Sequence, residues 1–556
     1  IPSAAGYRLY VNELMDRHQL TLQETERINQ ALNLKMEELD RVIDRAGKVL
    51  SIRGFVPYVG AAGYWHPDLS RLAPMKLPWV EEFVCGANSS FPFWCLMGQS
   101  YRNCAAVGLT NVTDDCRVRA RMNQEAGGYE LSFDIAVDPS TAPFRIYVDM
   151  RPLPLEETVA AFRRLLMPQA PCYPCGAWEP VYCTWYAAHT VLSKEFLEEN
   201  ARLARQLGFG TFIVDDGWCL DEDKRVTPAT LPTWYEWIGD WRLSEKKLPR
   251  MKSTIRKAHA DGWNYMFWVA PFFVGDRSGL RRRTNAFLTE SHEGERLFDP
   301  ADAEASRITM ESIMSVFREM DLDGLKIDFI DAIAPDERRP HARAVMRYVT
   351  ELVKRIRAEK PDALIEFRQN YGTPSTVGLA TAFRAGDVPF DYVENFQRCI
   401  QLRLLLGDGV PVHADPIYFR ADEIPGNIAR HLMASMAGVP MLSMDLRGLS
   451  AEQLSIIANY LAVYRKWQKT LNFGHWEFRF SFGHTAWARC RGEQGTVVFL
   501  WEKELLEQAL ENVAGSAVVL NLSDEELGCA GMTAYDETGA ETGSSTARVG
   551  GRLERP

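Results

Sequence analysis

The sequence lacks any apolar run long enough to cross a membrane. No stretch approaches the roughly 20 consecutive apolar residues that a transmembrane helix requires. It also lacks an excess of positive charge, because the formal net charge at pH 7 is -11. A nucleic-acid partner would favour basic stripes, and no Lys/Arg block suits an anionic lipid surface. We therefore expect neither a nucleic acid nor a membrane as partner.

Signs of disulfide pairing and of export are also scarce. The eleven cysteines are an odd number and are scattered, which indicates reduced thiols and a cytoplasmic location. Cys172 and Cys175 have CxxC spacing, but no second pair with suitable spacing follows, so we expect no metal site. The chain starts at Ile1 without a basic-then-apolar leader. A leader removed by processing is left open.

Three patterns follow one another along the chain. Residues 20–50 carry apolar side chains at helical spacing, and residues 79–150 alternate as β-strands do. The first pattern predicts one or two amphipathic helices, and the second a compact antiparallel β-domain. We divide the chain into residues 1–165 (helical segment, β-domain and linker helix), residues 166–470 (a catalytic barrel) and residues 471–556 (a C-terminal β-sandwich).

In the middle region, strands and helices alternate, which is typical of a parallel sheet with helical crossovers. Eight strands are expected at residues 181–185, 211–214, 265–269, 325–329, 364–367, 381–385, 410–413 and 440–443. Eight strands over roughly 300 residues fit an α/β fold of the (β/α)8 TIM-barrel type. An open doubly wound sheet is the alternative, but no Gly-rich phosphate loop follows a strand.

The fourth predicted strand carries charge in an apolar setting. Leu325 and Ile327 alternate with Lys326 and Asp328, so the two charged side chains share one face of the strand. An inward face with a Lys and an Asp describes a barrel strand that ends at an active site. A half-exposed strand with a surface ion pair is the alternative.

The ends of the other predicted strands are also polar or aromatic. Catalytic residues of such barrels concentrate at the carboxyl ends of the strands. Trp185, Asp215, Asp216, Trp218, Trp268, Glu366, Arg368, Arg384, Asp387, His413, Asp415 and Asp445 occupy these positions. Any single Asp after a strand has the alternative of a helix cap. Together the carboxylates and tryptophans predict a polar pocket with aromatic walls.

Several of these segments resemble glycoside hydrolase family 36, the melibiase or α-galactosidase family in the clan shared with families 27 and 31. The segments are VDDGW at residues 214–218, LKIDF at residues 325–329, GD at residues 386–387 and GDWRLSEKKLP at residues 239–249. The resemblance implies a retaining α-glycoside hydrolase without a cofactor that acts on a small α-glycoside or oligosaccharide. By analogy with the family, a homo-oligomer is also expected.

The resemblance also assigns roles to residues. Asp328 is the implied nucleophile and Asp387 the implied acid/base. The implied substrate-binding residues are Asp215, Asp216, Trp218, Trp268, Lys326, Glu366, Arg368, Arg384 and Trp185. Lys326 should keep Asp328 charged, whereas the pKa of Asp387 should be raised toward the working pH. The two carboxyl groups should lie about 5–6 Å apart, as in retaining enzymes.

The chain also departs from the family pattern. Glu366 and Arg368 stand where the family's fifth strand is rich in Cys, Ser and Gly, and Gly386 stands where Ser is usual. A glucoside, an N-acetylgalactosaminide or an acidic sugar is therefore an alternative glycone, and transglycosylation an alternative reaction. Other classes stay open: a metal-dependent sugar isomerase using Asp328, Glu366, His413 and Asp415, a Schiff-base enzyme using Lys326, or an inactive carbohydrate-binding barrel.

Overall fold

The computed structural model describes residues 48–76, 79–167, 171–481 and 484–556. The helices predicted for residues 20–50 fall mostly on residues 1–47, outside the described residues. Residues 48–50 already belong to a strand rather than a helix. The chain forms two compact units, one of Ile1–Gln169 with Pro335–Ala342 and one of Ala170–Ala334 with Arg343–Pro556.

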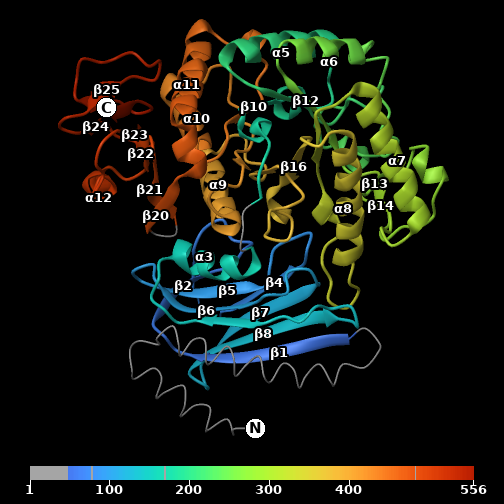
Figure 1. The fold of residues 1–556 in the computed structure, drawn as a ribbon, viewed down its shortest axis with the longest axis horizontal. Helices are drawn as coiled ribbons and strands as arrows, with labels where there is room; N and C mark the ends of the chain where they lie inside the picture. Colours follow the sequence, from blue (N-terminus) through green and yellow to red (C-terminus); the bar gives the residue numbers. More distant parts are fainter. Residues whose placement is uncertain (1–47, 77–78, 168–170, 482–483) are drawn as a thin grey trace. The chain divides into compact units, whose positions relative to one another are not determined.

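The first unit contains two antiparallel sheets, as predicted for the β-domain. One has the order β1-β8-β7-β4 and the other β3-β2-β5-β6-β9 (Figure 1). The strands are β1 (Lys48–Pro57), β2 (Ala61–Trp65), β3 (Ala73–Pro74), β4 (Val80–Cys85), β5 (Phe93–Gly98), β6 (Asn103–Leu109), β7 (Cys116–Asn123), β8 (Gly128–Val137) and β9 (Ile146–Asp149).

Strand alternation decides which side chains fill the core of this unit. In β5, Trp94 lies in the core cluster that also holds Phe83 and Leu131 of the other sheet. Its neighbour Phe93 points the other way and stacks on Phe162, with ring centroids 4.9 Å apart. Phe162 belongs to α3 (Leu155–Leu166), which covers this outer face with its buried side.

The second unit is built on the predicted barrel, which is confirmed. Eight strands pair in the order β18-β17-β16-β15-β12-β11-β10-β19, and each neighbouring pair is parallel. They are β10 (Val181–Cys183), β11 (Thr211–Val214), β12 (Asn264–Val269), β15 (Gly324–Ile327), β16 (Leu364–Arg368), β17 (Ala382–Arg384), β18 (Val412–His413) and β19 (Met441–Leu442). The seam between the seventh and eighth strands is bridged by backbone bonds such as Ala414 N–H to Val439 O and Ile417 N–H to Met441 O, both 3.0 Å.

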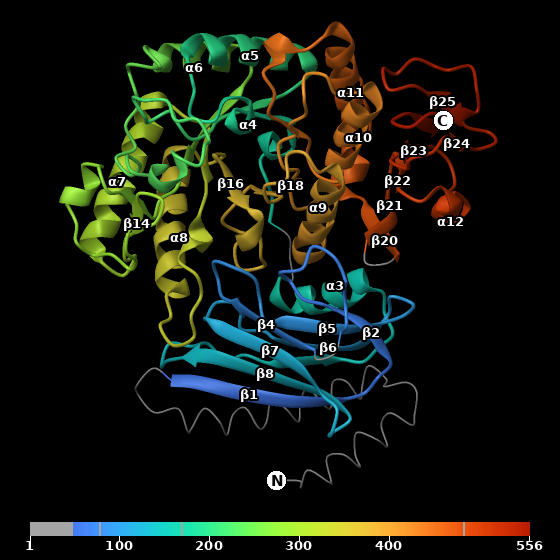
Figure 2. The same cartoon turned by 180° about the vertical axis from the view of Figure 1, so that it is seen from behind.

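Helices lie around these strands (Figures 1 and 2). They are α4 (Trp185–Ala188), α5 (Lys194–Leu207), α6 (Met251–Ala260), α7 (Ala303–Met320), α8 (Ala342–Glu359), α9 (Tyr392–Leu406), α10 (Pro425–Ser435) and α11 (Ala451–Phe473), with the hairpin β13 (Phe273–Gly275) and β14 (Glu295–Leu297) between β12 and α7. None of the helices in the described part of the chain is long and apolar enough to cross a membrane.

The fourth strand ends earlier than the sequence pattern predicts. It stops at Ile327, and Phe329 has a left-handed backbone with φ 54°. The chain therefore turns immediately after Asp328 into the short 3-10 helix Ile330–Ala332. Lys326 and Asp328 are both about 5% exposed. The alternative of a surface ion pair is therefore wrong.

The C-terminal part of the second unit is a β-structure beside α11. A six-stranded sheet has the order β20-β21-β22-β23-β27-β25, and β24 pairs with β26. The elements are β20 (His475–Ser481), β21 (His484–Gly492), β22 (Gly495–Leu500), α12 (Leu506–Ala509), β23 (Ala517–Asn521), β24 (Leu527–Gly528), β25 (Thr533–Tyr535), β26 (Thr546–Ala547) and β27 (Arg552–Arg555).

The start of the fourth barrel strand has no room for a side chain. A Cβ atom at Gly324 would lie 2.1 Å from the backbone oxygen of Leu364 on β16. We expect Gly324→Ala to lower the free energy of unfolding by about 3 kcal/mol, since a backbone atom of a paired strand cannot move aside. Gly378→Ala is the control, because nothing lies within 4 Å of its Cβ position. Denaturant unfolding followed by circular dichroism measures both, and equal midpoints would contradict the prediction.

Candidate active site

Asp328 lies at the carboxyl end of the fourth strand and is held by three donors. The indole Nε1–H of Trp268 donates to its Oδ2 over 3.1 Å. Its Oδ1 accepts the backbone N–H of Phe329 at 3.0 Å and faces the hydroxyl of Tyr371 at 3.4 Å. The left-handed turn at Phe329 brings this N–H back to the carboxylate. The carboxylate is thus oriented from two sides.

Of the cations that act on Asp328, Arg368 lowers its pKa the most. Burial alone would raise the pKa of Asp328, but Arg368, then Lys326 and Arg384, outweigh it, and the pKa lies below its ordinary value. The Arg368 Nη1 atom is 3.6 Å from Asp328 Oδ1. Its guanidinium also lies over the ring of Phe329, 5.3 Å from the centroid. Asp328 is therefore an ionised carboxylate at neutral pH.

The same guanidinium contacts Asp387, the second predicted catalytic residue. Arg368 Nη2 donates to Asp387 Oδ2 over 2.5 Å, and Arg384 Nη1 donates to Oδ1 over 2.9 Å. Arg368 thus joins Asp328 and Asp387 at one place. The side chain of Asp387 is 41% exposed, whereas that of Asp328 is 7% exposed.

The charge state of Asp387 differs from the prediction. Desolvation would raise its pKa, as expected for an acid/base, but Arg384 and Arg368 outweigh it and hold the pKa well below its usual range. The prediction of a raised pKa is therefore wrong for this structure. The reason is that two arginines, from the fifth and sixth strands, meet at this carboxylate.

Arg384 is anchored beneath Asp387 by a second carboxylate. Its Nη1 also donates to Asp415 Oδ1 and to the backbone oxygen of Ala385. Asp415 is fully buried and accepts the hydroxyl of Tyr186 at 3.1 Å and the N–H of Val388 at 2.7 Å. Burial raises the pKa of Asp415 to about 7, although Arg384 opposes the shift.

Glu366 does not face the entrance of the site as expected for a substrate-binding residue. It is 2% exposed, and His413 Nδ1 lies 3.1 Å from its Oε2. Its other oxygen lies 3.7 Å from Arg384 Nε. Glu366 is thus buried between His413 and Arg384, and its binding of substrate stays a prediction.

Lys326 is paired with Asp215 rather than directly with the nucleophile candidate. Its Nζ donates to Asp215 Oδ2 over 2.6 Å, and both side chains are buried. The thiol of Cys183 donates to the same oxygen over 3.2 Å. Burial would lower the pKa of Lys326, but Asp215 outweighs it and raises the pKa. Lys326 still acts on Asp328, as the second of the cations that lower its pKa.

Asp216, a predicted substrate-binding residue, has one carboxylate oxygen without a hydrogen-bond partner. Its Oδ2 accepts the indole N–H of Trp234 at 3.2 Å, while its buried Oδ1 accepts no hydrogen bond. Burial, with a further contribution from Asp215, raises the pKa of Asp216 to about 7. The half-buried Trp185 packs edge-on against Trp234, with centroids 6.2 Å apart.

The two other predicted aromatic walls are core residues. Trp218 is fully buried, stacks on Phe267 and Trp241, and donates its indole N–H to the backbone oxygen of Trp268 over 2.8 Å. Trp268 is 2% exposed and supports Asp328 from below. Neither forms an exposed wall, because the strand-two loop folds Trp218 back onto the third strand.

The loop that carries Asp387 has a glycine directly before it. A Cβ atom at Gly386 would lie 2.6 Å from Nη1 of Arg398. The backbone N–H of Gly386 donates to Gln369 Oε1 over 2.7 Å. Asp391 then caps α9 by accepting the N–H of Glu394. The guanidinium of Arg398 thus occupies the space that a Ser side chain at this position would use.

The carboxylates of this region are not arranged as a metal cage. Among the described residues, no group of three or more His, Cys, Asp or Glu side chains could hold a metal ion. Of the side chains considered for a metal-dependent isomerase, Asp328 and Asp415 contact arginines of the protein. Glu366 and His413 contact each other. Asp445, after the eighth strand, is a helix cap that accepts the N–H of Arg447.

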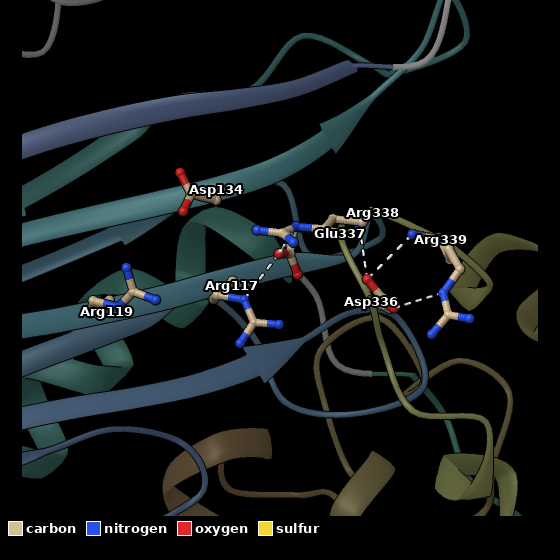
Figure 3. Close-up of a pocket in the computed structure, with 7 residues that line it drawn as sticks. All are labelled: Arg117, Arg119, Asp134, Asp336, Glu337, Arg338 and Arg339. Atoms are coloured by element: carbon tan, nitrogen blue, oxygen red, sulfur yellow. Dashed lines mark hydrogen bonds and ion pairs between the residues drawn. The ribbon is translucent and has the colours of Figure 1, made fainter.

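A cavity of about 650 Å³ lies elsewhere, within the first unit (Figure 3). It is lined by Arg117, Arg119, Asp134, Asp336, Glu337, Arg338 and Arg339. Arg117 is paired with Glu82 and Glu337, and Arg119 with Glu82. None of the predicted site residues lines this cavity, so it is separate from the chemistry of the barrel.

Sequence reasoning missed three residues that bind the candidate carboxylates. Tyr371 bonds Asp328, Tyr186 bonds Asp415 and Trp234 bonds Asp216. Tyr186 directly follows Trp185 and Tyr371 lies three residues after Arg368, so a search just beyond the strand ends would have found both. Trp234 lies in the long loop after the second strand, where no local pattern marks it.

The chain was compared with curated proteins and with protein-family models. It is 28% identical over 102 residues to the α-galactosidase AgaA of Geobacillus stearothermophilus, which is 18% of this chain and 12% of that protein. It is 22% identical over 191 residues to the bifunctional α-galactosidase/sucrose kinase AgaSK of Mediterraneibacter gnavus, 33% of this chain and 20% of that protein. A stretch of 84 residues, 15% of this chain and 23% of the relative, is 27% identical to the transcription repressor HrcA of Fusobacterium nucleatum. No family model matches.

The folds are more alike than the sequences. A crystal structure of AgaA, a family 36 α-galactosidase, in complex with stachyose superposes with a TM-score of 0.61 at 15% identity, covering 80% of this chain and 66% of AgaA. The galactosidase domain of AgaSK gives 0.61 at 13% identity, covering 89% of this chain and 70% of that one. The chain thus spans less than two thirds of the curated relatives it matches. It has the fold of the family 36 α-galactosidases, which confirms, at the level of the fold, the resemblance that its motifs predicted.

Proposed function

We propose that the protein is a retaining α-glycoside hydrolase that releases a terminal α-linked hexose, with an α-galactoside as the first candidate substrate. The observation that carries this proposal is the meeting of Asp328 and Asp387 at the guanidinium of Arg368. Two carboxyl groups on opposite sides of one glycosidic bond are what double displacement requires. The fold shared with family 36 α-galactosidases supports the same reading.

In the first step, Asp328 is the nucleophile. Its ionised carboxylate, oriented by Trp268 and Tyr371, attacks the anomeric carbon as the bond to the leaving oxygen breaks. Asp387 donates its proton to that oxygen, so an alcohol leaves and a glycosyl ester on Asp328 forms. Arg368 and Lys326 stabilise Asp328 in the charged form that attacks.

Asp387 must gain a proton before it can act as the acid. In the free protein both of its oxygens accept hydrogen bonds from arginines. Arg384 is buried, whereas the side chain of Arg368 is 18% exposed and also contacts Asp328 and the Phe329 ring. We therefore assign to substrate binding the displacement of Arg368 from Asp387, which removes the nearer cation and raises the carboxyl pKa.

In the second step, water replaces the departed alcohol. Asp387, now a carboxylate, takes a proton from the water as its oxygen attacks the anomeric carbon and the ester bond to Asp328 breaks. Two inversions give a hexose of retained configuration. Asp216, with its unpartnered Oδ1, and the neighbouring Asp215 are the groups proposed to bind hydroxyls of the glycone.

The choice of galactose rests on the relatives, since the AgaA structures contain stachyose or raffinose. A screen of nitrophenyl α-galactoside, α-glucoside, α-N-acetylgalactosaminide and an acidic analogue tests it. Fastest turnover of the galactoside with the α-anomer released first, followed by NMR, is the expected result. A first product of inverted configuration would overturn the retaining mechanism.

Azide distinguishes the two carboxylates. We expect Asp328→Ala and Asp387→Ala each to lower turnover of nitrophenyl α-galactoside by roughly three orders of magnitude. In Asp328→Ala, azide attacks the substrate directly from the vacated face and gives the β-glycosyl azide. In Asp387→Ala, azide attacks the β-linked glycosyl ester and gives the α-glycosyl azide. NMR of the products identifies the anomer.

Asp445→Ala is the matched control for these variants, because Asp445 also follows a barrel strand but caps a helix and pairs with Arg447. It should keep nearly full activity. Full activity of Asp328→Ala, or the same azide anomer from both variants, would contradict the roles assigned to the two carboxylates.

The pH profile reports the charge of Arg368. Arg368→Gln removes a cation that lowers the pKa values of both Asp328 and Asp387. Loss of the cation disfavours both ionised forms, so both carboxyl pKa values rise. The two limbs of kcat/KM report the ionisation of Asp328 and of Asp387 in the free protein, and both should therefore move to higher pH. Limbs that stay in place would contradict these contacts.

A further inference from the structure

We propose that Glu366 and His413 form a buried positioning pair that fixes Arg384 and, through it, Asp387. This inference rests on the proposed function, because it assigns the acid/base role to Asp387. Neither residue of the pair reaches the entrance of the site, as Glu366 is 2% and His413 5% exposed. They act on the reaction through Arg384 rather than by touching the substrate.

The hydrogen bonds of the pair demand an additional proton. His413 Nε2 lies 2.9 Å from the backbone oxygen of Ala177, and Nδ1 lies 3.1 Å from Glu366 Oε2. A carbonyl oxygen only accepts, so Nε2 carries a proton. A carboxylate also only accepts, so either Nδ1 carries a second proton or Glu366 is protonated. Burial raises the pKa of Glu366, but Lys326 and Arg384 lower it together with His413, and these two cations favour the carboxylate beside a doubly protonated ring.

Glu366 completes the surroundings of Arg384. Arg384 Nη1 is used by Asp387, Asp415 and the Ala385 backbone oxygen. Its Nε has no hydrogen-bond partner and lies 3.7 Å from Glu366 Oε1, which also has none. These two atoms, neither of which has a hydrogen-bond partner, thus face each other as opposite charges. A buried guanidinium needs such counter-charges to stay in one place.

The strand registers make this arrangement rigid. Arg384 pairs with Arg368 on one side and with His413 on the other, and Glu366 lies opposite Lys326. The ionisable groups that surround Arg384 are Asp387, Asp415, Asp328, Glu366, Tyr186, Arg368 and Lys326. Asp387 lies on an exposed loop. Arg384 is therefore the contact that fixes the position of the Asp387 carboxylate. Loss of the Glu366 charge should let Arg384 move and should loosen its contact with Asp387.

The dependence on leaving group tests the pair. A nitrophenyl leaving group departs with little help from an acid, whereas methanol leaving from methyl α-galactoside needs a well-placed proton donor, which contributes about 10²–10⁴-fold. We expect Glu366→Gln to raise the ratio of kcat/KM for the nitrophenyl substrate over the methyl substrate by about tenfold, a part of that contribution. This ratio does not depend on the folded fraction of the sample, so a less stable variant is still informative.

His431→Gln is the control, since His431 is also a buried histidine of the second unit but packs on Tyr392. Its ratio should match that of the unchanged protein. An unchanged ratio in Glu366→Gln would overturn the positioning role while the proposed function stands. No turnover of either substrate by the unchanged protein would instead overturn the proposed function, and the role assigned to the pair with it.

Nitrogen NMR of protein carrying ¹⁵N-histidine tests the proton directly. From the hydrogen-bond geometry, both ring nitrogens of His413 should carry protons in the unchanged protein, and in Glu366→Gln one proton should be lost, because the glutamine amide can donate to Nδ1. A His413 ring with one proton in the unchanged protein, beside an ionised Glu366, would contradict the hydrogen-bond geometry.

Discussion

Charge neutralisation inside the barrel is the constraint on which the site depends. Asp215, Asp328 and Asp415 are all buried at the carboxyl ends of the strands, where unpaired charge is very costly. Three cations resolve this: Lys326 pairs with Asp215, Arg384 with Asp415, and Arg368 contacts Asp328 and Asp387. Removing any one of them would leave a neighbour unpaired.

The charged side chains at the carboxyl ends of the barrel strands form a fixed, buried layer and an accessible layer. Below, Glu366, His413 and Arg384 come from adjacent strands whose backbone register places them side by side. Above, Asp387 and Arg368 reach the exposed rim. Groups on strands are held more precisely than groups on loops. Asp387 lies on a loop, and Arg368 is the last residue of β16 with its side chain 18% exposed, so these two groups are freer to change partners when a substrate enters.

The sequence alone predicted much of the fold and part of the site. All eight barrel strands were placed to within two residues because their apolar runs and the intervening amphipathic helices are local patterns. The location of the candidate site residues directly after the strands was also predictable, because parallel strands bring their carboxyl ends to one rim of the barrel. Lys326 and Asp328 share a face for the same local reason. These predictions need no knowledge of which strands are neighbours in the barrel.

Partners and charge states were decided only by the tertiary structure. Lys326 bonds Asp215, Trp218 lies in the core, and Asp387 has a lowered pKa instead of a raised one. Each of these three outcomes depends on a side chain from another strand or from a distant loop. The alternation of residues along one strand does not reveal such a contact. A pattern therefore determines which residues arrive at the rim. Burial and the neighbours across the barrel determine what each of them bonds and which of them holds a proton.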